Sequence, residues 1–263
     1  MEPDQCIGPD VNFNSILAID LDSGRIQWNR QLGGYDVFYF ACLIPNNPDC
    51  PPGPNLSADF GEAPMLLTIS VNGTTRDAVA AVQKSGFVWC LDRDNGRILW
   101  SKKAGPGGIE GGGQWGAATD GRRVYTNIVN SNRENFTLKP TTQTTTAGAW
   151  VALDANSGAI LWSTANPSND TAHGPVTVAN GVLFAGSVAP NGPIYAIDTS
   201  NGKIIWAYTL VQLFMGVPQP TTAAFTLGMD TRLTLLPSYI QLGLQEPHCL
   251  HSVLCEDYES LHK

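Results

Sequence analysis

The stretch AIDLDSGRIQW, from Ala18 to Trp28, decides the fold of this protein. An apolar pair leads to an aspartate, a polar turn ends in glycine, and alternating apolar residues lead to a tryptophan. This pattern predicts a β-hairpin, because glycine accepts the positive φ of the turn and aspartate can bond the turn backbone. Close copies follow at Cys90–Trp100, Ala152–Trp162 and Ala196–Trp206. The chain therefore repeats one hairpin four times.

The spacing of the hairpins points to a repeat architecture. The closing tryptophans stand at positions 28, 100, 162 and 206, so the spacings are 72, 62 and 44 residues. A spacing of 40-odd residues is typical of one four-stranded propeller blade, and the longer spacings fit blades that carry loops. No segment before residue 210 has sustained helical periodicity. The sequence predicts an all-β fold, with further strands at 65–71, 77–83, 122–129, 147–153 and 175–188, the last turning at Asn180-Gly181.

Charge and hydropathy exclude several classes of protein. The net charge is −8 and charged residues make up only 14% of the 263 residues. A nucleic-acid-binding protein would need a basic face, and we expect none here. No run of 18 apolar residues is present, so we expect no transmembrane helix. The first ten residues, MEPDQCIGPD, lack the basic and apolar regions of a signal peptide.

The cysteines and the glycosylation sequons favour an oxidising compartment. Cys42 and Cys50 flank a loop of seven residues, LIPNNPD, which suits a local disulfide. Two unpaired loop cysteines are the alternative. Cys90 lies in a predicted strand and is expected to be a small core residue. Asn-x-Ser/Thr sequons, which predict a secreted glycoprotein, stand at Asn55, Asn72, Asn135 and Asn169.

The four hairpins resemble the tryptophan-docking repeat of quinoprotein alcohol dehydrogenases, which use pyrroloquinoline quinone (PQQ). The polyvinyl-alcohol-dehydrogenase-like branch, with its plant members, is the most similar, over about residues 5–210. That family forms an eight-bladed β-propeller in which each repeat tryptophan packs on the neighbouring blade. The resemblance implies that residues 1–211 form about four blades of an eight-bladed ring, as part of a longer chain. No fifth hairpin follows residue 211, so we expect the tail, 212–263, to be non-repeating and poorly ordered or aberrant.

Two segments resemble the PQQ-binding loops of that family. In AVQKSGFVWCLDRDNG, Lys84 matches a cation that contacts the quinone oxygens. A positive charge there would polarise the carbonyls. In GPGGIEGGGQWGAATDGRRVY, Gln114 and Trp115 match a Gly-Gly-x-Asn-Trp segment beside the cofactor, with glutamine in place of the usual asparagine. The alternatives are a solvated lysine at a strand end for Lys84 and a core position for Trp115.

A third segment, IGPDVNFNSILAIDLDSG, resembles the one that holds the catalytic aspartate of the family. Asp10 stands eight residues before Ala18, one residue off the spacing of the family. The resemblance implies that Asp10 is the general base that takes the proton of the alcohol. An aspartate in an ordinary loop is the alternative.

Other features of the family are missing from this sequence. The vicinal cysteine pair over which the dehydrogenases bind PQQ is absent. The glutamate and asparagine that hold Ca²⁺ in the family would come from blades before Met1. Glu62 is a spare carboxylate, but its spacing matches no ligand position. No haem-binding motif is present, and the cluster of His248, Cys249, His251 and Cys255 matches no zinc pattern. We therefore predict no metal-ligating residues and no haem.

Three functions remain open on this sequence. The first is an oxidoreductase that transfers a hydride from a small alcohol to PQQ, with Ca²⁺ as a second cofactor. The second is a non-catalytic, secreted propeller that binds a partner or acts as a scaffold. The third is an inactive, truncated product. A partial ring would expose blade faces, through which copies of the chain could associate.

Overall fold

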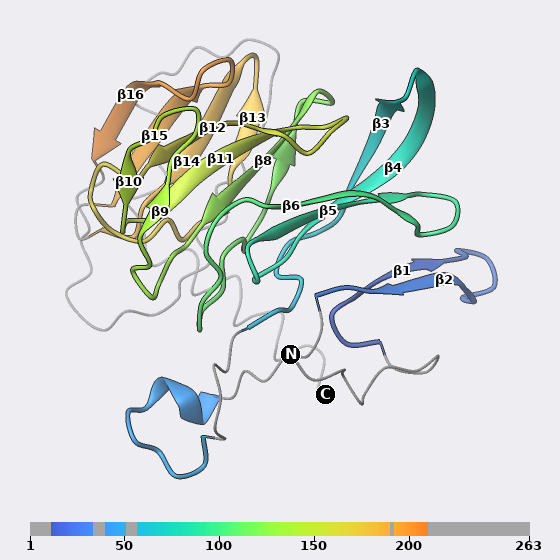
Figure 1. The fold of residues 1–263 in the computed structure, drawn as a ribbon, viewed down its shortest axis with the longest axis horizontal. Coiled ribbons are helices and arrows are strands. Elements are labelled where there is room, and N and C mark those ends of the chain that lie inside the picture. Colours follow the sequence, from blue (N-terminus) through green and yellow to red (C-terminus); the bar gives the residue numbers. More distant parts are fainter. Residues whose placement is uncertain (1–11, 34–39, 51–56, 190–191, 210–263) are drawn as a thin grey trace, which may run out of the picture. The chain divides into compact units, whose positions relative to one another are not determined.

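The computed structural model describes residues 12–33, 40–50, 57–189 and 192–209 (Figure 1). The chain divides into two compact units, Met1–Val217 and Pro218–Lys263, and all described residues belong to the first. Apart from one short 3₁₀ helix, η1 (Phe40–Leu43), the regular structure of the described residues is β-strand, as predicted. Asp10, Asn55 and the predicted tail 212–263 lie outside the described residues.

Three antiparallel sheets of four strands form the body of this unit (Figure 1). Their strands run in chain order across each sheet, which is the pattern of a propeller blade. The first sheet contains β3 (Met65–Val71), β4 (Thr74–Val82), β5 (Phe87–Asp92) and β6 (Ile98–Lys103). The second contains β7 (Ala118–Thr119), β8 (Arg123–Ile128), β11 (Ala149–Asp154) and β12 (Ile160–Ala165). The third contains β13 (Thr177–Ala179), β14 (Val182–Gly186), β15 (Pro193–Asp198) and β16 (Ile204–Thr209).

Two smaller pairs of strands complete the described part. β1 (Ser15–Ile19) and β2 (Ile26–Gln31) form a two-stranded sheet that contains the first repeat hairpin. β9 (Phe136–Thr137) and β10 (Thr144–Thr145) pair within the long connection between β8 and β11. The repeat hairpin always supplies the last two strands of a four-stranded sheet, so β1 and β2 represent half of a blade.

The four repeat hairpins have the same local geometry. Each closing tryptophan pairs with the residue two positions before the aspartate, and a β-bulge follows that pair: Ala18 with Trp28, Cys90 with Trp100, Ala152 with Trp162, and Ala196 with Trp206. Each turn glycine donates its N–H to the aspartate carbonyl at 2.8 Å and has a φ of +65° to +74°. The repeated sequence therefore produces a repeated backbone, bulge included.

The repeat tryptophans join each hairpin to the next one in the chain. The indole N–H of Trp28 donates to the Arg93 carbonyl at 2.8 Å, that of Trp100 to Ala155 at 3.0 Å, and that of Trp162 to Thr199 at 2.8 Å. Each ring also covers the turn glycine of that next hairpin, so closely that a Cβ there would lie 2.5 or 2.6 Å from the ring. The implied packing of blade on blade by these tryptophans is confirmed for the three internal contacts.

Apolar side chains fill the spaces between neighbouring sheets. Ile16 of β1 and Leu32, which follows β2, pack with Val79 and Leu91 of the first sheet. A second cluster joins the first and second sheets, and a third joins the second and third. Cys90 is fully buried in the second cluster, as predicted, and burial raises the pKa of its thiol to about 12. This thiol is therefore a packing group rather than a nucleophile.

The disulfide predicted between the loop cysteines is present, and the described sequon asparagines are exposed. Cys42 and Cys50 form a disulfide, with their Cα atoms 4.8 Å apart. Asn72, Asn135 and Asn169 are all exposed, and Asn72 stands in the turn between β3 and β4. Across the described ranges, no helix has the length and apolar character needed to cross a bilayer. Three of the four sequon asparagines are therefore at the surface, and their glycosylation stays a prediction.

A pair of glycine substitutions measures the packing of the tryptophans on the turns. Gly158 and Gly24 occupy the same turn position with φ of +70° and +69°, but a Cβ at Gly158 would lie 2.5 Å from Trp100, whereas one at Gly24 would have no atom within 4 Å. We expect Gly24→Ala to cost about 1–2 kcal/mol from backbone strain alone, and Gly158→Ala to cost more because the ring must move. Urea unfolding measures the free energy of unfolding of both variants. Equal losses of that free energy in the two variants would contradict the expected contribution of the Trp100 ring.

Candidate functional site

The segments that lead into the three sheets lie side by side. The Trp115 N–H donates to the Gly61 carbonyl at 3.1 Å, and Gly61 and Gln114 form a parallel β-bridge. In the same way, the Val176 N–H donates to the Gly116 carbonyl at 3.0 Å. Each entry segment is thus hydrogen-bonded to the entry segment of the next sheet. The residues that the sequence assigned to cofactor binding gather along this line.

Lys84 stands in the turn between β4 and β5, and its ammonium group is held in place. Its Nζ lies 3.0 Å from Oδ2 of Asp59, and its backbone N–H donates to the Asp59 carbonyl at 2.9 Å. The aliphatic stem packs against Gly111, where a Cβ would lie 2.7 Å from the Lys84 Cβ. A half-exposed ion pair contributes little to stability, so the pair mainly fixes the position of the charge. Lys84 is therefore not the freely solvated lysine of the alternative interpretation.

The glycine-rich segment presents Trp115 outward. Trp115 is 50% exposed and has a φ of +79°, a backbone conformation that large residues rarely adopt. Gly116, which follows it, has a φ of +157°. Neighbouring Gln114 is buried, and its N–H donates to Oδ1 of the buried Asn127 at 3.3 Å. The core interpretation of Trp115 is thus wrong, since half of its surface is open to a ligand.

Glu62 is a buried carboxyl group that the sequence argument left without a role. It is 6% exposed, its Oε1 accepts a hydrogen bond from Thr126 Oγ1 at 3.3 Å, and its Oε2 is buried without a partner. Burial raises the pKa of Glu62 to about 8, so the group is mostly protonated at neutral pH. Gly113 closes over it, since a Cβ there would lie 3.3 Å from Oε1.

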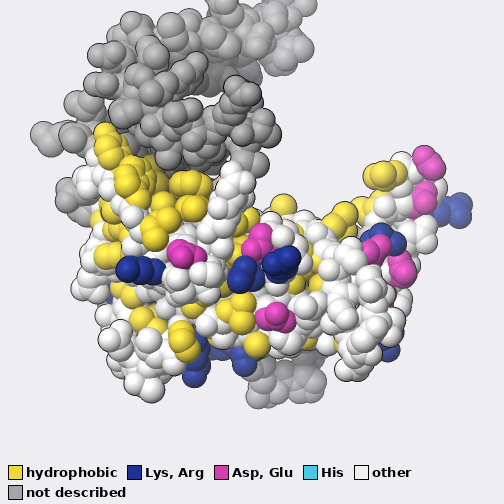
Figure 2. All heavy atoms as spheres, turned by 90° about the horizontal axis from the view of Figure 1, so that it is seen from above, with side chains coloured by type: hydrophobic (Ala, Val, Ile, Leu, Met, Phe, Trp, Pro, Cys, Tyr) yellow, Lys and Arg dark blue, Asp and Glu magenta, His cyan; other side chains and the backbone are white. Residues whose placement is uncertain are grey.

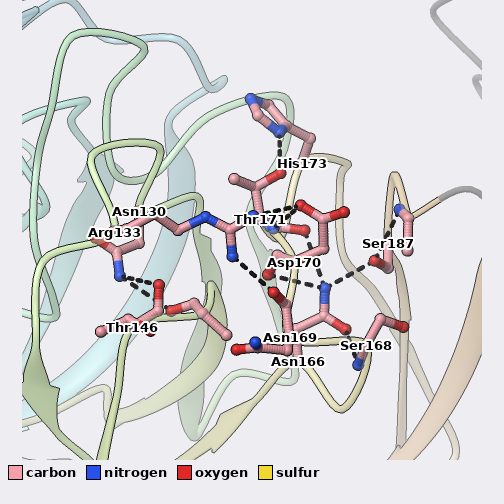
Figure 3. Close-up of polar contacts among 12 residues, drawn as sticks. Asn130, Arg133, Thr146, Asn166, Ser168, Asn169, Asp170, Thr171, His173 and Ser187 are labelled. Atoms are coloured by element: carbon pink, nitrogen blue, oxygen red, sulfur yellow. Dashed lines mark hydrogen bonds and ion pairs between the residues drawn. The ribbon is translucent and has the colours of Figure 1, made fainter.

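A network of polar side chains braces the loops beside this site (Figure 3). The Asn166 Nδ2 reaches the carbonyls of Asp170 and Thr171 and the Ser187 hydroxyl at 2.7–3.2 Å. Arg133 donates to the Asp170 carboxylate at 2.9 Å. These contacts tie together three loops that are distant in the sequence, and they occupy both polar atoms of the Asn166 side chain. We therefore assign the network a structural role.

One residue links this network to the glycine-rich segment. His173 Nε2 lies 3.2 Å from Glu110 Oε2, and its Nδ1 lies 2.8 Å from the Thr171 hydroxyl. Burial lowers the pKa of His173, and the Glu110 charge offsets part of that shift. Because Glu110 precedes Gly111, the contact helps to hold the segment that carries Gln114 and Trp115.

The structure brings three of the predicted site residues together and leaves one outside. A Cβ on Gly61 would lie 3.2 Å both from Gln114 Cβ and from Lys84 Cε, so these two side chains flank Gly61, and Trp115 follows at once. Asp10 lies outside the described residues and stays a prediction. The described residues contain no group of three or more His, Cys, Asp or Glu side chains that could hold a metal ion. Two surface hollows of about 260 Å³ lie elsewhere, against Arg93 and Leu66.

Comparison with known proteins supports the family suggested by the hairpins. Residues 55–111 match the family profile described as the β-propeller domain of glucose, ethanol and alcohol dehydrogenases. Residues 147–228 match the profile described as outer membrane protein assembly factor BamB, a PQQ-type repeat. The first of these matches covers Lys84 and ends at Gly111, before Gln114 and Trp115.

Two curated proteins share sequence with most of this chain. A polyvinylalcohol dehydrogenase of a Pseudomonas species is 30% identical over 208 residues, which is 74% of this chain and 30% of that protein. A polyvinylalcohol dehydrogenase of Sphingopyxis sp. strain 113P3 is 31% identical over 215 residues, which is 75% of this chain and 31% of that protein. The chain therefore spans less than a third of the length of these relatives.

A solved structure agrees with the fold. The quinohemoprotein alcohol dehydrogenase of Comamonas testosteroni has a TM-score of 0.53 and 18% identity, over 77% of this chain and 36% of the other. At this identity the similarity supports the fold alone. The matched profiles and the similarity to two polyvinylalcohol dehydrogenases, together with the repeated hairpins and four-stranded sheets, place the chain in the PQQ-type β-propeller family, with distant similarity to polyvinylalcohol dehydrogenases.

Proposed function

We propose that this chain carries part of a quinoprotein-type site for the oxidation of an alcohol, in which Lys84 contacts the ring oxygens of PQQ. The observation that supports this most is the placement of the Lys84 ammonium by Asp59 beside a glycine-rich segment with a half-exposed tryptophan. PQQ, when bound, would supply the hydride acceptor for the alcohol. Lys84 would stabilise negative charge on the quinone oxygen, and Trp115 would lie against the flat ring.

The described residues fit the quinone better than they fit a calcium ion. Calcium needs six to eight oxygen ligands, several of them carboxylates, and the described residues contain no such cluster. Glu62 is protonated at neutral pH, since burial raises its pKa to about 8. We therefore assign no calcium ligand among the residues that the structure describes. The proposed base, Asp10, would take the proton of the alcohol hydroxyl.

Binding of PQQ, with and without Ca²⁺, tests the proposal through quenching of tryptophan fluorescence. We expect saturable quenching that Lys84→Ala weakens by about tenfold or more, because a hydrogen bond to a charged group is lost. Lys103→Ala is the matched control, since Lys103 is an exposed lysine on β6. Trp115→Phe should keep binding but lower the quenching. Absence of saturable quenching, or equal quenching in Lys84→Ala, would exclude the site.

A non-catalytic function is the alternative, and one observation favours it. Residues 147–228 match a family profile named for an assembly factor. In this case the chain acts as a secreted propeller that binds a partner or serves as a scaffold, glycosylated at its exposed sequons. A folded chain that does not bind PQQ would support it. A chain that does not fold would instead support an inactive, truncated product.

A further inference from the structure

Every internal contact between hairpins has a donor side and a receiving side. The donor is the repeat tryptophan, whose N–H bonds the carbonyl of the residue after the next hairpin's aspartate. The receiver is the turn glycine, which the ring covers. The residue two positions after the tryptophan adds a contact, as Arg30 donates to the Gly96 carbonyl at 2.8 Å and Thr164 to that of Gly202 at 2.5 Å. This interface is therefore directional, from one hairpin to the next.

The last hairpin presents a donor side with no receiver among the described residues. Trp206 is 42% exposed, whereas its counterpart Trp162 is 2% exposed. Trp206 stacks on Tyr208, with ring centroids 5.7 Å apart, and both rings lie on β16 beside the exposed Ile205. Figure 2 shows hydrophobic side chains gathered on the side of the molecule where Figure 1 draws β13–β16. This surface repeats the donor half of the internal interface.

The first hairpin presents a receiving side with no donor in the described ranges. A Cβ on Gly24 would have no atom within 4 Å, whereas the three equivalent glycines are each covered by a tryptophan. In the three internal contacts the indole N–H donates to the carbonyl of the residue after the hairpin's aspartate. Leu21 occupies that position in the first hairpin, and it is 99% exposed. The backbone of this turn already has the receiving geometry, since Gly24 has a φ of +69°.

We propose that a second copy of this chain docks head to tail on the first, with Trp206 of one copy covering the Gly24 turn of the other. The Trp206 N–H then donates to the Leu21 carbonyl of the second copy. The chain carries both halves of a contact that it already makes three times internally, so another copy supplies the matching geometry without any rearrangement of the two hairpins. Such a contact between unlike surfaces closes into a ring or continues as a filament, and both forms contain the same interface.

Sedimentation equilibrium of the full chain, from micromolar to near-millimolar concentration, tests the proposed head-to-tail docking. We expect the wild-type chain to associate, and Trp206→Ala to raise the dissociation constant by about 30-fold or more, as for a buried aromatic anchor. Gly24→Asn should have a similar effect, because asparagine tolerates the positive φ but places a side chain where the ring must lie. Gly73→Asn is the control, since Gly73 has a φ of +76°, equally open space and no place in the interface.

Mixing the two variants separates this geometry from other modes of association. Trp206→Ala keeps an intact receiving turn and Gly24→Asn keeps an intact donor. A mixture should therefore associate at a concentration at which each variant alone stays monomeric. A wild-type chain that stays monomeric at every concentration would overturn the proposal. The proposal would also be overturned if Gly24→Asn associated as well as the wild type, which would indicate a symmetric mode of association. A mixture of the two variants that stays monomeric would overturn it too. PQQ binding is measured separately and does not affect these outcomes.

Discussion

Trp162→Ala is expected to lower the free energy of unfolding by about 3–5 kcal/mol. Trp162 is almost completely buried, its ring lies 6.1 Å from that of Tyr125, and its N–H donates to the Thr199 carbonyl at 2.8 Å. Alanine would leave a cavity between the second and third sheets, and it would leave that carbonyl without its donor. Urea unfolding followed by far-ultraviolet circular dichroism measures the loss.

Trp206→Ala is the matched control for this prediction, because Trp206 occupies the same position in the fourth hairpin. Its ring stacks on Tyr208 but is not covered by a further hairpin of the described chain. The expected loss is therefore below about 1.5 kcal/mol, which is the range of a single ring pair. The measurement belongs at a protein concentration where the wild-type chain is monomeric. Equal losses in the two variants would show that docking on the next hairpin does not stabilise the sheets.

Much of the fold could be predicted from the sequence because its signals are local. The aspartate, the turn glycine and the tryptophan each act within one hairpin, so four copies predict four hairpins of one geometry. The Asn180-Gly181 turn between β13 and β14 is equally local. In contrast, the β9–β10 pair could not be predicted, because strands of two residues are too short to show an alternating apolar pattern. Its loop is held instead by Asn130, which donates hydrogen bonds to the Glu134 and Thr146 carbonyls.

Only part of the geometry of the candidate site could be expected from local sequence signals. Lys84 and Trp115 were singled out because each lies in a motif, and their role in binding stays a prediction. The sequence does not show that Asp59 holds Lys84 or that Trp115 has a positive φ. Those features depend on the packing of one entry segment on the next. Glu62 was left without a role because its burial comes from Gly113 and Thr126, which are more than 50 residues away in the chain. No local pattern could indicate its raised pKa.

Glu62 is expected to make the stability of the protein depend on pH. Burial raises its pKa from the ordinary value of 4.5 to about 8 in the folded state. Between these values the folded state keeps a proton that the unfolded state has released, so stability falls as pH rises. The contribution is fully present below about pH 4.5 and is lost as pH rises through about 8. Across this range the loss should reach a maximum of roughly 5 kcal/mol.

Glu62→Gln isolates this effect, because the glutamine keeps a carbonyl oxygen for the Thr126 hydroxyl and carries no charge at any pH. The free energy of unfolding of the variant should fall less steeply than that of the wild type between pH 5 and 8, and the variant should be the more stable at pH 8. His173 titrates in the opposite direction, since burial lowers its pKa, and it contributes equally to both proteins. Glu134→Gln, at an exposed position, serves as the control. Parallel curves for wild type and Glu62→Gln would mean that Glu62 is ionised in the folded protein, and its carboxylate would then be available to a cation.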